Sequence, residues 1–227
     1  MTGKFIVLEG VEGCGKSTQL QFLLNSLLDS RPFQQLQRQG IVAHILTSRE
    51  PGGTNLGARL RQLLLHQDDD VRINARAELL LYAADRAQHV DQVIRPALNQ
   101  GCWVLCDRFI DSTLAYQGYG RGLDLELIYQ LNRIATAGLT PDLTLWLKLP
   151  VEQGLARVKQ RGMGDRMERA DLAFHQRVQQ GFELLAQQYP QNRATIDAGD
   201  SPTAVAGAIF AVVKTYLSQW YPNALPT

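Results

Sequence analysis

Residues 5–17 read FIVLEGVEGCGKS, an apolar run followed from Gly10 to Ser17 by the pattern G-x-x-x-x-G-K-S. Glycines in such a loop let backbone N–H groups turn inward around an anion. The leucines that follow recur at helical spacing, and the N-terminus of a helix adds unpaired N–H groups and the positive end of its dipole. Lys16 supplies a positive charge, and the Ser17 hydroxyl can ligate Mg²⁺. The stretch predicts a strand, a phosphate-binding loop and a helix.

Two other interpretations of this loop fit less well. A glycine-rich turn with an exposed lysine does not explain why a lysine and a hydroxyl residue both follow the last glycine. A dinucleotide-binding fingerprint requires G-x-G-x-x-G, whereas the glycines here stand at positions 10, 13 and 15. The pattern therefore favours nucleotide phosphates.

Composition narrows the class of protein. The 227 residues are 45% hydrophobic and 20% charged, with a formal net charge of +1, which is ordinary for one globular domain. A net charge so close to zero argues against a protein that binds nucleic acid through a large basic surface. The apolar stretch 204–213 is too short to span a bilayer. The three cysteines have neither metal-ligand spacing nor a C-x-x-C pattern, which favours reduced thiols and a cytoplasmic location.

Apolar strands alternate with amphipathic helices along the whole chain. This order predicts an α/β fold of one domain, residues 1–227, with a five-stranded parallel sheet flanked by helices on both faces. The expected strands are Phe5–Leu8, Ile41–Leu46, Trp103–Cys106, Leu143–Leu149 and Ala194–Ile196. The expected helices are Ser17–Leu28, Gly57–Leu65, Ala75–Asn99, Leu125–Ala137, Val151–Gln160, Ala170–Gln188 and Thr203–Trp220.

Three stretches interrupt this regular pattern. Pro96 favours an end or a kink in the helix that contains it. The polar, glutamine-rich stretch Ser30–Gly40 is interpreted as a surface connection. Residues 161–169 contain two glycines, three arginines and little apolar content between two helices, which indicates a mobile cationic lid over residues 161–170.

Polar clusters follow the second and third strands, at residues 47–54 and 107–117. Ligands of open α/β sheets bind at the carboxyl ends of the strands, which is also where the loop Gly10–Ser17 lies. Tyr82 and Arg86 share one helix face at spacing i, i+4. Each feature alone has a simpler explanation. Arg49 and Glu50 could form a surface ion pair, Asp107 and Arg108 a salt bridge at the strand end, and Tyr82 could be a core aromatic. Their convergence at one edge predicts a single site.

These segments together resemble the thymidylate kinases, P-loop enzymes of nucleotide metabolism. The resemblance rests on the loop Gly10–Ser17, on Arg49-Glu50-Pro51-Gly52-Gly53-Thr54, on Ala84-Asp85-Arg86, on Asp107-Arg108-Phe109 with Ser112, Ala115, Tyr116 and Gln117, and on Arg161-Gly162 with Asp165-Arg166. The matches keep the family order from Phe5 to about Asp197. The segment 49–54 is the most diagnostic, because related monophosphate kinases do not usually carry it.

The resemblance implies transfer of the γ-phosphoryl group of ATP to dTMP, which gives dTDP and ADP in dTTP synthesis. Lys16 and the loop amides would hold the ATP phosphates, with Mg²⁺ near Ser17. Asp107 would act through Mg²⁺ and its waters or orient the reacting groups. The implied ATP-binding residues are Gly10, Val11, Glu12, Gly13, Cys14, Gly15, Lys16, Ser17 and Thr18.

The resemblance also implies an acceptor pocket. Arg108 and Arg49 would engage or frame the dTMP phosphate, and Glu50 would lie near them. Tyr82 would stack on thymine and Arg86 would bind the base edge. Tyr116 would pack near the deoxyribose. The implied dTMP-binding residues are Glu12, Arg49, Glu50, Pro51, Tyr82, Arg86, Arg108, Ser112, Thr113, Tyr116 and Gln117.

One departure from some relatives concerns the catalytic cation. Some thymidylate kinases carry an arginine inside the phosphate loop, where this chain has Gly13. The lid then becomes the expected source of the catalytic cation, with Arg161 as the main contributor and Arg166 in support. The simpler alternative is that the lid arginines are solvated surface charges. The catalytic set implied by the family is Lys16, Asp107, Arg108, Arg161 and Arg166.

Two other functions remain open at this stage. Another nucleoside monophosphate kinase would share the loop, the lid and the Asp-Arg pair, and would differ in the base pocket around Tyr82, Arg86 and Thr113. A regulatory P-loop ATPase would hydrolyse ATP without an acceptor. The family further implies a homodimer, for which an apolar face on the helix Ala75–Asn99 could serve. The net charge and the short apolar stretch argue against nucleic acid and membrane as partners.

Overall fold

Five parallel strands form the centre of the protein, in the order β2-β3-β1-β4-β5. They are β1 (Phe5–Glu9), β2 (Ile45–Arg49), β3 (Trp103–Asp107), β4 (Leu143–Lys148) and β5 (Arg193–Asp197). The structure is a computed structural model that describes residues 3–66, 72–162, 164–188 and 190–224. Met163 of the expected lid lies outside the described residues. The five-stranded parallel sheet predicted from the sequence is confirmed.

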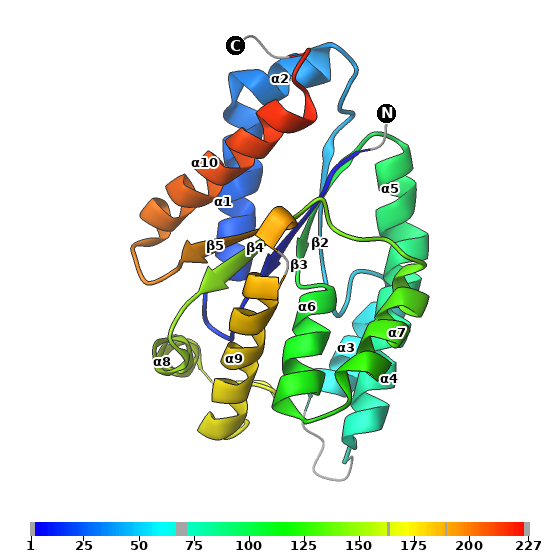
Figure 1. Cartoon of the computed structure of the whole chain (residues 1–227), viewed down its shortest axis with the longest axis vertical. Helices are drawn as coiled ribbons and strands as arrows, with labels where there is room; N and C mark the ends of the chain where they lie inside the picture. Colours follow the sequence, from blue (N-terminus) through cyan, green and yellow to red (C-terminus); the bar gives the residue numbers. More distant parts are fainter. Residues whose placement is uncertain (1–2, 67–71, 163, 189, 225–227) are drawn as a thin grey trace.

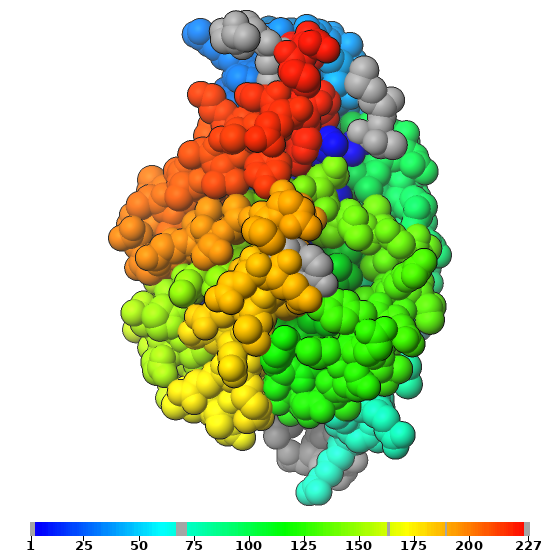
Figure 2. All heavy atoms as spheres, in the orientation of Figure 1, coloured from blue at the N-terminus to red at the C-terminus, as the bar shows by residue number. Residues whose placement is uncertain are grey.

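Helices cover both faces of this sheet (Figure 1). The helices are α1 (Lys16–Asp29), α2 (Arg31–Arg38), α3 (Asn55–Leu65), α4 (Ala75–His89), α5 (Arg95–Asn99), α6 (Ile110–Thr113), α7 (Leu125–Thr136), α8 (Val151–Arg161), α9 (Leu172–Gln188) and α10 (Pro202–Trp220). The shorter turns are η1 (Val90–Ile94), η2 (Leu114–Gly120) and η3 (Pro190–Asn192). In Figure 1, α1, α2 and α10 lie on one side of the sheet, and α3, α4, α5 and α7 lie on the other. Figure 2 shows how α9 and α10 cover much of the face turned toward the viewer.

Alternation along β1 explains why both faces are covered. Phe5 and Val7 belong to the core packed under η1 and α5, whereas Ile6 and Leu8 belong to the core under α1 and α10. All four side chains are at most 1% exposed. Burial of about 25 cal/mol per Å² of apolar surface on both faces makes this central strand the least replaceable element of the sheet.

The connection Ser30–Gly40 differs from expectation, because it contains helix α2. Ser30 accepts a hydrogen bond from the Phe33 N–H as a helix cap, and Pro stands in the first turn. Phe33 and Leu36, one helical turn apart, are buried, and Phe33 meets Trp103 edge to face. The stretch is a connection on the surface, as expected, but it is helical, and Phe33 and Leu36 anchor it to the core.

The second strand also differs, since it begins at Ile45 and not at Ile41. The N–H groups of Ile41 and Val42 donate to the Leu36 carbonyl and so close the end of α2. Ile45 is the first residue that pairs with β3, opposite Trp103. The β-branched residues at 41 and 42 gave the sequence a strand signal that this cap overrides.

Two helical segments depart from the predicted layout. The expected helix Ala75–Asn99 is divided into α4, the π-helical turn η1 and α5, and the wider turn ends just before Pro96, which has no N–H to donate. Residues 110–120, part of the polar cluster expected after the third strand, are helical as α6 and η2. Their apolar residues, such as Leu114 and Ala115, are buried.

The strand register brings the polar segments together. Asp107 at the end of β3 lies opposite Leu8 of β1 and Arg49 of β2. The loop after β1, the loop after β2 and the turn after β3 therefore start at one edge of the sheet.

Every helix within the described residues is too short or too polar to cross a bilayer. All three cysteines are buried free thiols.

Candidate functional site

The loop between β1 and α1 is shaped by its glycines. Gly15 caps α1 with a φ of 93°, and Gly13 has a φ of 71°. A Cβ atom at Gly13 would collide with the backbone carbonyl of Gly154 in α8. Because the loop and α8 touch backbone to backbone, position 13 has no room for an arginine side chain.

Lys16 is folded over this loop. Its Nζ donates to the carbonyls of Gly10, at 3.1 Å, and Val11, at 2.9 Å, and lies 3.5 Å from the Cys14 Sγ. Residues 12–18 line the adjoining cavity. Gly10 and Val11 do not line it, and they contribute the two carbonyls that accept from Lys16. Within the described residues, this ammonium group contacts two carbonyls and a thiol, which it can exchange for anionic oxygens.

A cavity of about 720 Å³ lies at this edge of the sheet. Its lining joins the loop to the segments after β2 and β3, to α4, and to the lid segment, defined as residues 161–170. The predicted residues that line it are Glu12, Gly13, Cys14, Gly15, Lys16, Ser17, Thr18, Arg49, Glu50, Pro51, Tyr82, Arg86, Asp107, Arg108, Ser112, Thr113, Tyr116, Gln117 and Arg161. The structure therefore brings nearly all predicted site residues into one cavity.

Arg108 links the turn after β3 to the phosphate loop. Its guanidinium donates to Glu12 Oε1 at 2.6 Å, to the Tyr116 hydroxyl at 3.1 Å and to the Gly10 carbonyl at 3.1 Å. It also lies over the Tyr116 ring, 4.9 Å from the centroid. The guanidinium also lines the cavity, where its positive charge and planar set of donors suit a phosphate.

Glu12 is the anion of this cluster. Burial alone would raise the pKa of Glu12, but the cations of Arg108 and Lys16 and the Tyr116 hydroxyl together lower it to about 2. The hydroxyl of Tyr116 donates to Glu12 Oε1 at 2.9 Å. Glu12 is therefore ionised near neutral pH and fixes both Arg108 and Tyr116.

Ser17 and Asp107 meet at the floor of the cavity, where the Ser17 Oγ donates to Asp107 Oδ2 at 2.7 Å. A hydroxyl and a carboxylate are the oxygen ligands that Mg²⁺ prefers, usually completed by water and substrate phosphates. Among the described residues, no three His, Cys, Asp or Glu side chains are grouped to bind a metal ion by themselves. The pair fits a Mg²⁺ that arrives with a nucleotide.

Arg49 has a cationic neighbour that the sequence analysis did not single out. Arg61 of α3 lines the same cavity, and its Nη1 donates to the Pro51 carbonyl at 2.9 Å. Burial and the positive charge of Arg49 both lower the pKa of Arg61. Two adjacent guanidinium groups are mutually unfavourable until an anion lies between them, so this part of the cavity is prepared for a phosphate.

Arg86 lies under the opposite part of the cavity and is 2% exposed. It donates to Glu50, Thr113, Asn132 and the Phe109 carbonyl at 2.6–2.9 Å. Glu50 also pairs with Nδ1 of His89, so it contacts Arg86 and His89 and not Arg108. These four acceptors account for four of the five guanidinium N–H groups and leave one for a ligand.

The upper wall of this part is formed by Tyr82 and Gln117. Burial raises the pKa of Tyr82, so its phenol stays neutral. Gln117 donates through Nε2 to Glu78 at 2.8 Å, which leaves its amide oxygen as an acceptor for the cavity. A neutral aromatic ring, an amide and one N–H of a guanidinium suit a planar heterocycle.

The two lid arginines lie in different surroundings. Arg161 ends α8, lines the cavity and pairs with Glu168 at 2.6 Å, with its side chain 67% exposed. The Arg166 side chain is more buried and is not among the residues that line the cavity. Its Nε donates to the Leu64 carbonyl at 2.7 Å, and its Nη2 pairs with Glu78 at 2.6 Å. In this structure Arg166 holds the lid segment against α3 and α4. Its supporting catalytic role stays a prediction.

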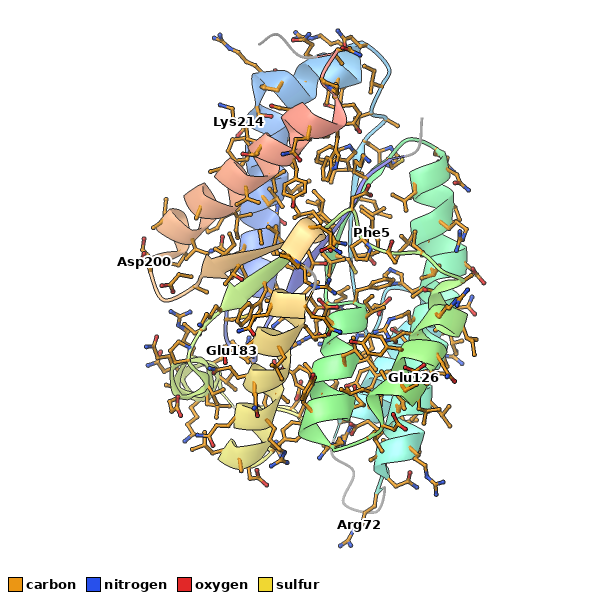
Figure 3. The ribbon with its side chains drawn as sticks, viewed as in Figure 1. Phe5, Arg72, Glu126, Glu183, Asp200 and Lys214 are labelled. Carbon is orange, nitrogen blue, oxygen red and sulfur yellow. The ribbon has the colours of Figure 1, made fainter. Side chains whose placement is uncertain are left out.

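Further cavity residues went unnoticed in the sequence. Arg157 of α8 lines the cavity and donates to the Ala198 carbonyl at 3.3 Å. Asp200 lies between β5 and α10 (Figure 3) and lines the same end. Two rules could have found them: Arg157 precedes Arg161 by one helical turn, and Asp200 follows the carboxyl end of a strand.

Glu9, at the end of β1, supplies a pH-dependent test of the site. Burial and the nearby Asp111 carboxylate raise the pKa of Glu9 to about 7 against its ordinary 4.5, although Ser112, Arg108 and Phe109 oppose this. The folded protein therefore keeps this proton while the unfolded chain releases it, so Glu9 lowers stability as pH rises from 4.5 to 7.

We expect Glu9→Gln to remove this dependence. Relative to the wild type, the free energy of unfolding of the variant should rise by about 3 kcal/mol between pH 4.5 and 8. Urea unfolding at half-unit pH steps measures the difference. Parallel pH curves for the two proteins would contradict the elevated pKa.

Known proteins place this arrangement in a family. The sequence model of the thymidylate kinase family matches residues 8–209. A thymidylate kinase from Cyanothece sp. is 55% identical over 98% of this chain and 98% of its own length. One from Thermosynechococcus vestitus is 53% identical over 96% and 90%. The crystal structure of thymidylate kinase from Ehrlichia chaffeensis superposes with a TM-score of 0.72 at 30% identity, covering 94% of this chain and all of that one. The chain belongs to the thymidylate kinase family.

Proposed function

We propose that the cavity holds ATP and dTMP at once, with the phosphate loop between them. As a member of the thymidylate kinase family, the protein is an ATP:dTMP phosphotransferase that produces dTDP and ADP. The observation that carries the arrangement is the 2.6 Å pair between Arg108 and Glu12. It joins the acceptor side of the cavity to the loop that binds the donor phosphates.

The donor half is built from the loop and the ends of α8 and β5. Lys16 exchanges the carbonyls of Gly10 and Val11 for the β- and γ-phosphate oxygens of ATP. The loop N–H groups bind the same phosphates. Arg157 and Asp200, at the far end of the cavity, are left for the sugar and base of ATP.

Mg²⁺ is the cofactor that we propose for this half. Ser17 and Asp107 would hold it, directly or through water, because their oxygens already converge at 2.7 Å. Its charge would offset the negative charge of the ATP phosphates. Asp107 and Ser17 thereby fix the end of the phosphate chain beside the acceptor.

The acceptor half binds dTMP at both ends. Arg108, Arg49 and Arg61 surround the position of the 5′-phosphate, and Arg108 is fixed there by Glu12. Thymine stacks on Tyr82, with the remaining N–H of Arg86 and the amide of Gln117 at its polar edge. Tyr116 and Glu12 stand between base and phosphate, beside the deoxyribose.

The transfer itself is a matter of position and charge. Holding the acceptor oxygen and the γ-phosphorus within one closed site replaces a bimolecular encounter by a unimolecular step. Lys16, Arg108 and Arg161 offset the charge on the oxygens of the transferred group. Arg161 must first leave Glu168, and its 67% exposure leaves it room to turn into the cavity.

A panel of acceptors tests this base pocket. We expect kcat/KM for dTMP to exceed the values for AMP, GMP and dCMP by about 10³-fold or more, because their bases leave buried polar groups unpaired. The value for dUMP, which lacks one methyl group, should be lower by about tenfold to 200-fold. A higher value for any other monophosphate would overturn the assignment of the pocket.

We also propose that the enzyme acts in the cytoplasm as a homodimer built on α3, α4 and α7. These helices pack side by side (Figure 1). They carry large exposed apolar side chains: Leu56, Leu63, Leu80, Leu127 and Ile134, which are 44–75% exposed. Apolar side chains gathered on adjoining helices are typical of a surface that another subunit covers.

Leu80→Arg is expected to make the protein monomeric, because Leu80 lies on α4 between the other two helices. Sedimentation equilibrium at micromolar concentration measures the mass. Leu184→Arg is the matched control, since Leu184 is also exposed but lies on α9. A monomeric wild type, or loss of the dimer in both variants, would refute the assignment of this surface.

A further inference from the structure

Glu9 is a buried carboxylate that the proposed reaction does not use. It ends β1 immediately before the phosphate loop and is 1% exposed. Its Oε1 accepts the N–H groups of Phe109, at 2.8 Å, and Ser112, at 3.2 Å. Its Oε2 accepts the Ser112 hydroxyl at 2.6 Å. All these donors belong to the turn that follows Arg108. Glu9 therefore holds the turn after β3 from the neighbouring strand β1.

The backbone of this turn needs such a contact. Arg108 has a φ of 72°, in the left-handed region that residues with a Cβ rarely adopt. This conformation is unfavourable for a residue with a Cβ and persists only where surrounding contacts impose it. The Arg108 N–H donates to the Leu8 carbonyl at 3.0 Å, and the next N–H, of Phe109, donates to Glu9. Two consecutive residues of β1 therefore hold the two sides of the strained residue.

The same contacts aim the Arg108 side chain. The Ser112 hydroxyl that donates to Glu9 accepts from Arg108 Nη1 at 3.0 Å. A hydroxyl that gives its single hydrogen to a carboxylate keeps its lone pairs for the guanidinium. From Glu9 the order of contacts runs through Ser112 to Arg108, whose Nη2 donates to Glu12 at the cavity.

We propose that Glu9 is a positioning residue for Arg108, which it keeps aimed at the acceptor phosphate by accepting the N–H groups of Phe109 and Ser112. The inference rests on the proposed role of Arg108 in binding the dTMP phosphate. Glu9 itself touches neither substrate. Its loss acts mainly on the phosphate end of dTMP. At the base end, Arg86 contacts Phe109 and Thr113 of the same turn. It is also held by Glu50 and Asn132, which lie outside this turn.

Binding of dTMP and of thymidine, which lacks the phosphate, separates these two ends. Glu9→Leu removes both acceptor oxygens, and we expect its Kd for dTMP to rise about tenfold or more while its Kd for thymidine stays within about twofold of wild type. Glu9→Gln keeps an amide oxygen for the two N–H groups and should restore most of the dTMP affinity. Glu126→Gln on the outer side of α7 (Figure 3) is the matched control and should bind both ligands like wild type.

Several results would overturn the proposal. An equal loss of dTMP and thymidine affinity in Glu9→Leu would show a general structural role. A Glu9→Gln variant as weak as Glu9→Leu would show that the N–H contacts of Phe109 and Ser112 do not position Arg108. If Glu9→Leu does not fold, Glu9→Asp takes its place: it draws the carboxylate back by one methylene and should lower dTMP affinity alone. Unchanged dTMP binding by a folded Glu9→Leu or Glu9→Asp would also refute it.

Arg108→Ala distinguishes this failure from failure of the proposed function. If Arg108 binds the acceptor phosphate, Arg108→Ala loses affinity for dTMP and keeps it for thymidine. The double variant Glu9→Leu/Arg108→Ala should then bind dTMP no more weakly than Arg108→Ala, because Glu9 acts through Arg108. A selective loss in Arg108→Ala without one in Glu9→Leu refutes only the role of Glu9. No selective loss in Arg108→Ala refutes the role of Arg108.

Discussion

Arg161→Ala is expected to lower kcat by about 10³-fold or more, because an arginine that meets the transferred phosphoryl group supplies about 10³–10⁵ in rate. The KM values for ATP and dTMP should change little. The side chain is 67% exposed, and its ion pair within the described residues is with Glu168, so its loss should leave the fold intact. Pre-steady-state measurement of dTDP formation separates the transfer step from product release.

Arg38→Ala, an exposed arginine of α2 outside the cavity, is the control and should be fully active. A loss under tenfold in Arg161→Ala, with substrate affinity unchanged, would reduce Arg161 to a surface charge. Moving the cation back to the loop with Gly13→Arg should not rescue Arg161→Ala. The backbone contact between Gly13 and Gly154 leaves no room for that side chain.

Lys16→Met is expected to lower kcat by about 10²–10³-fold, the usual effect of removing one charge-stabilising donor from a transferring group. Methionine keeps the length of the side chain and removes its charge. The Kd for dTMP should stay near wild type, because the proposed position of the acceptor phosphate is against Arg108 and Arg49. Steady-state kinetics with both substrates varied measures kcat, and calorimetric binding of dTMP alone measures its Kd.

In the variant, the Gly10 carbonyl, which Lys16 now contacts, keeps Arg108 Nη1 as a donor. Lys214→Met, on the exposed side of α10 (Figure 3), is the matched control and should behave like wild type. If Lys16→Met keeps kcat within about tenfold of wild type, the loop is not where the donor phosphates react.

Residues with a local chemical reason to be where they are could be predicted from sequence. Gly10, Gly13, Gly15 and Lys16 are fixed by the geometry of a loop around an anion, and the buried strands by continuous apolar runs. The end of α2 escaped prediction because Ile41 and Val42 have strand propensity, while their N–H groups close a helix. Phe33 and Leu36 were hidden among glutamines because two apolar residues are too few for a periodic signal.

The site was predictable in membership and less so in its contacts. The rule that ligands collect at the carboxyl ends of strands placed Asp107 and Arg108 beside the loop. Sequence could not show that Glu50 supports Arg86 and His89, since this depends on how α4 packs over β2. Arg61 and Glu9 were missed for the same reason: each acts on residues distant in sequence, and neither carries a motif of its own.

Simultaneous measurement of ADP and dTDP, with ATP and Mg²⁺ in the presence and absence of dTMP, tests the central claim most directly. A site that holds both substrates across the phosphate loop predicts equimolar ADP and dTDP, with ADP formation falling at least about 10²-fold when dTMP is omitted. ADP release at a similar rate without dTMP, or in excess of dTDP, would contradict the account. The cavity would then be that of a hydrolase whose acceptor is water.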